Sequence, residues 1–273
     1  MNTREQLIKD LSKDVANDRI RLRPQNLQAL CEHVLGLLFS PLAPVEITNE
    51  QQITEYLDQS YALLSDIFSQ LNLGDCPWCE DQFSEILVKL RPLLKKDAEF
   101  IAMEDPAATN LYEVILSYPG LKAIALYRFA HELYLKKIPL LPRLITEFAH
   151  NQTGIDIHPG AQIGHPFFID HGTGIVIGET AIIGKFVKIF QGVTIGALSV
   201  AAKLKQTKRH PTIQDHVVIY SNASILGGET VIGEHSIVGG NVWITASVPS
   251  HTIVTHKSEA QFQGALKAGK TEN

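Results

Sequence analysis

Residues 174–196 read GIVIGETAIIGKFVKIFQGVTIG, and in them an aliphatic residue returns every six positions. Four consecutive hexads carry isoleucine at this position, namely Ile177, Ile183, Ile189 and Ile195. The position two residues earlier is aliphatic or small each time, and glycine often follows the isoleucine. A sustained hexapeptide period is typical of a parallel β-helix. This stretch therefore predicts that fold for the part of the chain around it.

The same period continues on both sides. Upstream it includes the pairs Ile155/Ile157 and Ala161/Ile163, and downstream it runs from Pro211/Ile213 to Val242/Ile244. Each hexad supplies one short strand and a corner, three hexads close a triangular coil, and the aliphatic side chains stack inward on those of neighbouring coils. Glycine relieves crowding at the corners. We predict a left-handed parallel β-helix over residues 151–254, followed by a C-terminal tail over 255–273.

One interval breaks the repeat. The spacing of 18 residues from Ile195 to Ile213 equals three hexads, but the inward positions would fall on Ala201 and Thr207, among four cationic residues. That stretch is too polar for the wall of a coil. We predict an excursion loop near residues 198–210, and a loop of this length in a compact domain usually has a function.

The first 150 residues have a different period. Leu63, Leu64, Ile67, Phe68 and Leu71 recur at the spacing of one helix face, and so do apolar residues between Ser84 and Leu94 and between Ala123 and Tyr134. Pro92 is expected to bend or end its helix. The fold class is therefore α+β, with an N-terminal all-α domain over residues 1–150 before the β-helix.

Composition excludes several classes of protein. The 273 residues are 45% hydrophobic and 19% charged, which argues against an extended disordered chain. A net charge of −5 argues against a nucleic-acid partner. The N-terminus has no apolar signal region, and no apolar run reaches the roughly 18 residues of a membrane-spanning helix. With only three cysteines, a disulfide framework is not expected, so we predict a cytoplasmic protein without a membrane partner.

Three short segments concentrate ionisable groups around the β-helix. They are Asp156-Ile157-His158-Pro159, Asp170-His171-Gly172-Thr173-Gly174 and Arg209-His210-Pro211. The second lies where two extra residues interrupt the repeat, and the third ends the basic loop. A histidine that acts as a base needs a carboxylate to fix its tautomer and stabilise the imidazolium. These segments are the candidate site.

Several motifs of the chain together resemble those of a known family. GIDIHPGAQIG (154–164), DHGTGIVIGETAIIG (170–184) and KRHPTI (208–213) resemble the serine O-acetyltransferases among the hexapeptide-repeat acyltransferases. EDPA (104–107) and YPGLKAIALYRFAHELY (118–134) resemble that family's last helical region, so the resemblance covers roughly residues 98–254. It implies an acyltransferase that moves acetyl from acetyl-CoA to the hydroxyl of L-serine. The product is O-acetyl-L-serine, on the route of cysteine biosynthesis.

The resemblance also implies roles for single residues. His171 resembles the general base, and Asp156, from a neighbouring coil or subunit, resembles the carboxylate that orients it. The substrate amino group is expected at Asp105 and Asp170, and the substrate carboxylate at Arg209 and His210. A guanidinium suits that task because its planar fork donates two parallel hydrogen bonds.

The co-substrate is acetyl-CoA, and no metal is expected because the thioester is already activated. In the family both substrates meet between adjacent β-helices of a trimer, and backbone amides line the CoA groove. Ala197, Ser221 and Gly239 are the matching positions. The family's loop is often glycine-rich, whereas Ala197 to Ala202 is followed here by lysines. Lys203, Lys205 and Lys208 are weaker candidates for CoA phosphates, with exposure to solvent the favoured alternative.

The expected assembly is a homotrimer or a dimer of trimers. L-cysteine, isosteric with serine, is expected to act as a feedback inhibitor. The family's tail often ends in an isoleucine that docks into O-acetylserine sulfhydrylase. This chain ends Lys270-Thr271-Glu272-Asn273, so we do not expect that partnership.

Other interpretations stay open on the sequence. Another hexapeptide acetyltransferase, with a sugar or amine acceptor, would keep His171 but would not need Arg209. A zinc hydro-lyase of the carbonic-anhydrase kind would need three histidines that converge between subunits, for which His158, His171 and His210 are available, but the DHGTG context favours the acyltransferase. A purely structural β-helix is least compatible with the clustered ionisable groups. The Cys76/Cys79 pair is interpreted as incidental or locally structural, since neither a redox βαβ context nor a second C-x-x-C is present.

Overall fold

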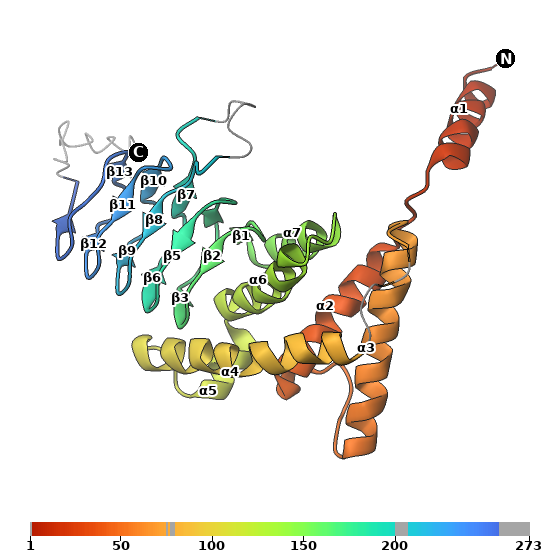
Figure 1. Cartoon of the computed structure of the whole chain (residues 1–273), viewed down its shortest axis with the longest axis horizontal. Coiled ribbons are helices and arrows are strands. Elements are labelled where there is room, and N and C mark those ends of the chain that lie inside the picture. The colour runs from red at the N-terminus through yellow and green to blue at the C-terminus, as the bar shows by residue number, and fades with distance from the viewer. Residues whose placement is uncertain (1, 75, 77–79, 200–206, 257–273) are drawn as a thin grey trace, which may run out of the picture.

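The computed structural model describes residues 2–74, 76, 80–199 and 207–256, in which helices precede a stack of short strands (Figure 1). The helices are α1 (Thr3–Asn17), α2 (Pro24–Leu38), the 3-10 helix η1 (Ser40–Leu42), α3 (Glu50–Gln70), α4 (Glu80–Glu104), α5 (Leu111–Ser117), α6 (Pro119–Leu135) and α7 (Leu141–Thr153). Within the described ranges, none of the helices combines the length and apolar character needed to cross a membrane.

Helix α6 lies at the centre of the helical part. Its residues are apolar on nearly every side, and from Leu121 to Ala130 most are fully buried against α2, α4 and α7. A helix that is apolar all round requires such burial. Pro92, which is expected to bend or end its helix, does not end it, because α4 continues to Glu104, and the bend stays a prediction. Leu90 and Leu94, on either side of this proline, are almost fully buried, and their packing holds the helix together.

The strands form a β-helix with parallel pairing throughout. They are β1 (Asp156–Ile157), β2 (Gln162–Ile163), β3 (Phe167–Ile169), β4 (Val176–Ile177), β5 (Ile182–Ile183), β6 (Val187–Ile189), β7 (Thr194–Gly196), β8 (Thr212–Ile213), β9 (Val218–Ile219), β10 (Ser224–Leu226), β11 (Val231–Ile232), β12 (Ile237–Val238), β13 (Trp243–Ile244) and β14 (Ile253–Val254). Three sheets result, in the orders β1-β4-β7-β10-β13, β2-β5-β8-β11 and β3-β6-β9-β12-β14. We call them sheets A, B and C.

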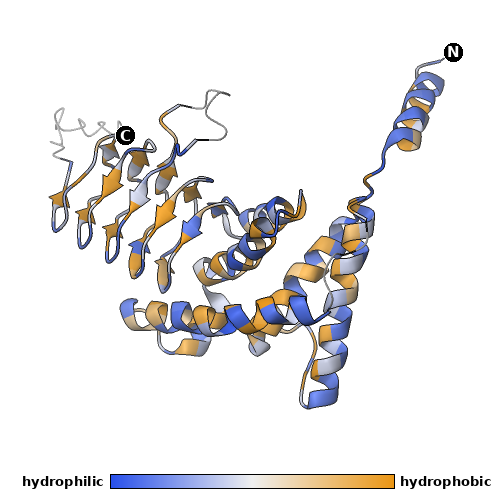
Figure 2. Ribbon diagram, viewed as in Figure 1, coloured by the Kyte–Doolittle hydropathy of each residue, from blue (hydrophilic) through white to orange (hydrophobic). Residues whose placement is uncertain are grey.

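The hexapeptide interpretation is confirmed in its register. Ile157 pairs with Ile177, Ile177 with Ile195, Ile195 with Ile225 and Ile225 with Ile244, so the repeated position stacks along sheet A. Nearly all the inward positions are buried, and Figure 2 shows the strands mainly in the hydrophobic colour. The predicted helical part followed by a parallel β-helix is thus confirmed. The left hand of the coil and the domain limits stay predictions.

Three corners carry the chain from sheet to sheet. The A-to-B corners follow β1, β4, β7 and β10, the B-to-C corners follow β2, β5, β8 and β11, and the C-to-A corners follow β3, β6, β9 and β12. On the B-to-C edge Phe186, His216, His235 and His251 have positive φ, and their rings stack in a column at centroid spacings of 4.7, 4.6 and 5.0 Å. The left-handed conformation costs energy for such residues, and ring stacking offsets part of that cost.

A buried ion pair joins the helices to the β-helix. Arg128 on α6 donates from Nε to Asp97 Oδ2 at 2.7 Å and from Nη2 to Asp97 Oδ1 at 3.0 Å. The same guanidinium donates to the carbonyls of Ile163 and Gly164, and Asp97 accepts from the amide of Phe167. Asp97 is 0% exposed, and Arg128 6%. This network fixes the first B-to-C corner against α4 and α6.

Some sequence expectations fall partly beyond the described residues. The chain leaves the repeat between β7 and β8, where the excursion loop is expected, but residues 200–206, with Lys203 and Lys205, lie outside the described ranges. Cys76 is half-buried, whereas Cys79 lies outside those ranges, so the Cys76/Cys79 interpretation stays a prediction.

Candidate active site

The predicted site residues separate onto two edges of the β-helix. Asp170 and His171 lie on the C-to-A edge after β3, with Ser221 after β9 and Gly239 after β12 on the same edge. Ala197 follows β7 on the A-to-B edge, where Arg209 and His210 also contact the corner after β4. Sheet A lies between the two edges, and Asp156 begins its first strand. One chain therefore carries the candidate site in two separate parts, which we call half-sites. The first contains His171 and the second contains Arg209 and His210.

The first half-site surrounds His171. With Asp105, Tyr118, Asp170 and Lys188, this histidine lines a cavity of about 630 Å³ between α4, α5 and sheet C. Its side chain is 69% exposed, and its Nδ1 lies 3.6 Å from Asp170 Oδ1. That separation is too long for a hydrogen bond but close enough for the carboxylate to stabilise a cation. The imidazole is thus open to a substrate and turned away from the aliphatic interior.

The corner sequence explains how His171 reaches this position. The two extra residues of the repeat fall here, and His171 itself has φ 55°. Gly172 follows with φ +90°, and a Cβ there would lie 2.4 Å from Ile155 Cδ1. Only glycine avoids both the strained backbone and this contact. The DHGTG segment therefore bulges from the coil and carries the imidazole outward.

Asp105 is held by its own segment and by a tyrosine. Its Oδ1 accepts from the amide of Ala107 at 2.8 Å, and its Oδ2 accepts from the Tyr118 hydroxyl at 2.6 Å. The hydrogen bond to this carboxylate raises the pKa of Tyr118 to about 12, because it favours the protonated phenol. Sequence reasoning missed Tyr118, although it begins the matched YPG motif. Beside it, Lys188 and Glu104 form an ion pair at 2.7 Å.

Asp156 is oriented by α7. Its Oδ1 accepts from Arg143 Nη1 at 3.2 Å, and Arg143 Nη2 pairs with Glu147. No hydrogen bond or ion pair joins Asp156 to His171 among the residues that the structure describes in one chain. The predicted partnership of these two residues is therefore not made within the chain in this conformation. Arg143 was missed because nothing near it in sequence marks it as a partner of Asp156.

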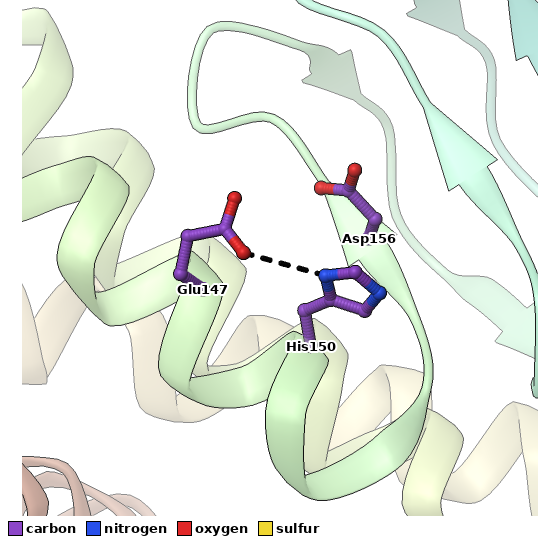
Figure 3. Close-up of side chains that lie close together, drawn as sticks. All are labelled: Glu147, His150 and Asp156. Atoms are coloured by element: carbon purple, nitrogen blue, oxygen red, sulfur yellow. Dashed lines mark hydrogen bonds and ion pairs between the residues drawn. The ribbon is translucent and has the colours of Figure 1, made fainter.

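Figure 3 shows Glu147 and His150 on α7 close to Asp156. Across the described ranges these are the one set of three potential metal-ligand side chains whose donor atoms lie within 4.8 Å of one another. Arg143 already supplies a positive charge to both carboxylates. The three histidines of the zinc alternative are not brought together in the described part of one chain: His158 and His210 share a half-site, and His171 lies in the other.

The second half-site contains Arg209 and His210. Arg209 Nη2 pairs with Glu179, which also accepts from the Tyr134 hydroxyl at 3.1 Å. Burial raises the pKa of Glu179, but the hydrogen bonds from Arg209 and Tyr134 outweigh it and lower that pKa overall. The carboxylate therefore stays ionised beside the guanidinium and fixes its position.

His210 is 7% exposed, and its Nδ1 lies 3.0 Å from the amide nitrogen of Thr180 and 2.9 Å from the Thr180 hydroxyl. Burial, followed by the charge of Arg209, lowers the pKa of His210 to about 4. The imidazole is therefore neutral near pH 7. Glu179 and Thr180 were not among the predicted site residues, although both lie inside the matched GET segment.

Lys208 is engaged within the chain. Its Nζ donates to the carbonyl oxygens of Thr180 at 3.0 Å and Pro211 at 3.3 Å, and also to that of His210. These contacts fix the end of the excursion loop on the A-to-B edge. Its ammonium group therefore stabilises the end of the loop within the chain, and a contact with a CoA phosphate stays a prediction.

Gly178 controls the position of His210. A Cβ at Gly178 would lie 2.1 Å from both Cδ2 and Nε2 of the imidazole, so the ring must move in Gly178→Ala. If His210 binds the acceptor, we expect KM for the acceptor to rise about 10-fold or more, with the Kd for CoA unchanged. Steady-state kinetics and calorimetry measure the two quantities. In a His210→Ala background the glycine substitution should add little; a full additional effect there would contradict this explanation.

Comparisons with known proteins point in one direction. No family model matches the chain. It is 48% identical over 186 residues to "Serine acetyltransferase, plasmid" of Synechococcus elongatus, a match covering 66% of this chain and 57% of that relative. It is also 48% identical over 162 residues to the serine acetyltransferase of Bacillus subtilis, covering 59% of this chain and 72% of the relative.

The chain is also similar to solved structures of serine acetyltransferases. Serine acetyltransferase 1 of Entamoeba histolytica in complex with L-cysteine is 36% identical with a TM-score of 0.70, covering 83% of this chain and 86% of that chain. The Neisseria gonorrhoeae serine acetyltransferase in complex with serine is 28% identical with a TM-score of 0.62, at 84% and 80% coverage. A Brucella abortus serine acetyltransferase in complex with coenzyme A is 25% identical with a TM-score of 0.61, at 84% and 80% coverage.

Proposed function

The chain belongs to the serine acetyltransferase family, and from that premise we propose that it transfers acetyl from acetyl-CoA to the hydroxyl of L-serine. The observation that carries the proposal is the content of the two half-sites. One offers an exposed imidazole with two carboxylates, and the other a partly buried guanidinium and a buried imidazole. Together they match an amino acid with a reactive hydroxyl: carboxylates for its ammonium group, cation and donor for its carboxylate, and a base for its hydroxyl.

The two half-sites require a second chain. In one chain sheet A separates the C-to-A edge from the A-to-B edge. A rotationally symmetric assembly can place the C-to-A edge of one protomer against the A-to-B edge of the next. A homotrimer closes three such interfaces and completes three sites, and trimers can pair further into hexamers. Asp156 and His171 of neighbouring coils or protomers would come together in the same assembly.

The reaction proceeds by general base catalysis. His171 takes the proton of the serine hydroxyl as the oxygen attacks the thioester carbon. The C–S bond then breaks, and the imidazolium returns the proton to the CoA sulfur, giving O-acetyl-L-serine and free CoA. Asp170, 3.6 Å from the ring, stabilises the cation formed in the first step, and Asp156 orients the ring. Holding alcohol and thioester together between two protomers adds an entropic advantage.

Acetyl-CoA would bind along the same crevice. Ser221 and Gly239 lie on the edge that carries His171, and Ala197 lies on the edge that carries the other half-site. Backbone groups at these three positions are proposed to line the groove, and the thioester needs no metal for activation. L-cysteine has the shape of serine with a thiol in place of the hydroxyl, so it is proposed to occupy the serine pocket as an inhibitor. A place in cysteine biosynthesis and in the cytoplasm follows from the same proposal.

An acceptor panel tests the proposed function. Release of free CoA from acetyl-CoA is followed with L-serine, homoserine, an amine and a sugar nucleotide as acceptors. We expect turnover with serine and inhibition by L-cysteine that serine relieves. Turnover with the sugar nucleotide and none with serine would replace the proposal by another hexapeptide acetyltransferase.

Arg209→Ala tests how the acceptor is recognised. Because the variant loses a charged hydrogen-bond donor for the substrate carboxylate, KM for serine should rise about 10- to 100-fold while KM for acetyl-CoA changes little. Arg23→Ala, an exposed arginine before α2, is the control and should leave both values unchanged. A larger effect on acetyl-CoA than on serine would assign Arg209 to the co-substrate instead.

A further inference from the structure

We propose that Thr180 is the positioning residue of the second half-site, and that it fixes His210 as a neutral hydrogen-bond donor through Nε2 for a carboxylate oxygen of the acceptor. The proposal rests on the proposed function and adds a residue and a proton position to it. Thr180 is in the A-to-B corner after β4, thirty residues before His210 in sequence.

The hydroxyl of Thr180 uses its whole hydrogen-bonding capacity on the Arg209-His210 segment. Its Oγ1 accepts from the amide of Arg209 at 2.9 Å and from the amide of His210 at 3.1 Å. It also lies 2.9 Å from His210 Nδ1. A hydroxyl has one proton and two acceptor positions. Because both backbone contacts are donors, the hydroxyl proton points to Nδ1.

The ring nitrogen Nδ1 therefore accepts and does not donate. It lies 3.0 Å from the amide nitrogen of Thr180, which can only donate, in addition to the hydroxyl. Two donors aimed at one imidazole nitrogen leave no room for a proton there. In a neutral imidazole the other nitrogen then carries the proton. Thr180 thus selects the tautomer with hydrogen on Nε2.

The charges around His210 act in the same direction. Arg209, Lys208 and His158 disfavour a proton on the ring, and Glu179 alone among the facing groups favours one. Burial is the largest of the unfavourable contributions, and together with these charges it lowers the pKa of His210 to about 4. The ring is therefore neutral over the physiological range, and the tautomer that Thr180 selects is the one that substrate meets.

Nε2 is the donor that remains for a ligand. Among the residues that the structure describes, no acceptor is hydrogen-bonded to Nε2 of His210. This nitrogen is also absent from the set of fully buried polar atoms that lack a hydrogen-bond partner. Gly178 lies directly beside it, and the missing side chain leaves room for the ring. A donor that is fixed, neutral and next to Arg209 suits a carboxylate. Arg209 supplies the positive charge that attracts the carboxylate of the acceptor, and the Nε2–H group of His210 donates a hydrogen bond that sets its orientation.

Thr180→Val tests the proposal because it removes the hydroxyl and keeps the shape. We expect KM for serine to rise about 10- to 100-fold with little change in the Kd for CoA, and Thr180→Ser to restore values near those of the unaltered protein. The pKa of His210, followed by its ¹⁵N chemical shifts, should rise in Thr180→Val, because His210 protonates more easily without the hydroxyl proton on Nδ1. Thr230→Val is the matched control, since its buried hydroxyl donates to the Leu226 carbonyl and contacts neither half-site among the described residues.

A spectroscopic readout separates this inference from the proposed function. In full-length protein labelled with ¹⁵N-histidine, His210 should show a protonated Nε2 and an unprotonated Nδ1 at pH 7, and Thr180→Val should weaken that preference. A proton on Nδ1, or a Thr180→Val variant with unchanged serine KM and an unchanged His210 tautomer and pKa, would overturn the inference. Absence of serine acetylation with the expected tautomer present would refute the acceptor assignment while leaving the tautomer claim standing.

Discussion

His171→Ala will lower kcat for acetyl transfer by about 10²- to 10⁴-fold while the Kd for CoA stays nearly constant. The serine hydroxyl is a poor nucleophile, and the exposed imidazole beside Asp170 is the group that removes its proton in the proposed mechanism. Stopped-flow or steady-state release of free CoA measures kcat, and calorimetry measures CoA affinity. His171→Gln keeps a polar side chain at this corner but offers no base, so it should be equally impaired.

His251→Ala is the matched control for this loss. That residue is also an exposed corner histidine with positive φ, but it lies on the B-to-C edge of the last coil, away from both half-sites. Its substitution should leave kcat unchanged. If His171→Ala retains more than about a tenth of the activity, the base lies elsewhere and the proposed mechanism is wrong.

Arg128→Met will lower the free energy of unfolding by about 3–5 kcal/mol. The substitution leaves Asp97, which is 0% exposed, as an uncompensated buried charge, and it frees the carbonyls of Ile163 and Gly164 as well. Removing one partner of a buried pair costs far more than the pair contributes as a whole. Denaturant unfolding at fixed protein concentration measures the change, since any assembly makes stability concentration-dependent.

An exposed ion pair supplies the comparison for Arg128. Lys89, whose side chain is 56% exposed, pairs with Glu132 at 2.8 Å on the same helical surface. Lys89→Met should change the free energy of unfolding by about 1 kcal/mol or less. Asp97→Asn combined with Arg128→Met should be less destabilised than the sum of the single variants, because the isolated charge is gone. Equal effects for Arg128→Met and Lys89→Met would show that burial does not set the strength of the network.

Sequence predicted the β-helix well because its cause is local. An isoleucine every six residues can be buried only if each coil stacks on the next, so Ile177, Ile195 and Ile225 were sufficient to give both the fold and the register. Helix α4 does not end at Pro92, because burial of Leu90 and Leu94 outweighs the local penalty of proline. Burial of apolar side chains determines the structure in both the β-helix and α4. Only in the β-helix is that burial visible in the sequence, as the six-residue period.

The residues that position the side chains of the site were harder to identify from the sequence. Tyr118, Arg143, Glu179 and Thr180 act on Asp105, Asp156, Arg209 and His210 through contacts between segments that are distant in sequence. Tyrosine, arginine, glutamate and threonine are common surface residues, so their type alone does not single them out. The stacking of coils brings Glu179 and Thr180 to their partners. The position of α7 brings Arg143 to Asp156, and the packing of the α5–α6 junction against the end of α4 brings Tyr118 to Asp105.

The amino-acid order by itself determined the coil, the helical part before it and the chemical groups available at the corners, because these depend on short-range backbone geometry and on burial of a regular pattern. Tertiary structure alone decided that the groups divide between two edges, that Arg143 holds Asp156, and that both Thr180 donors meet one nitrogen of His210. The physical reason is that a proton's position depends on the direction of donors and the charge nearby. Those are set by residues some thirty positions away that only the folded coils bring within 3 Å.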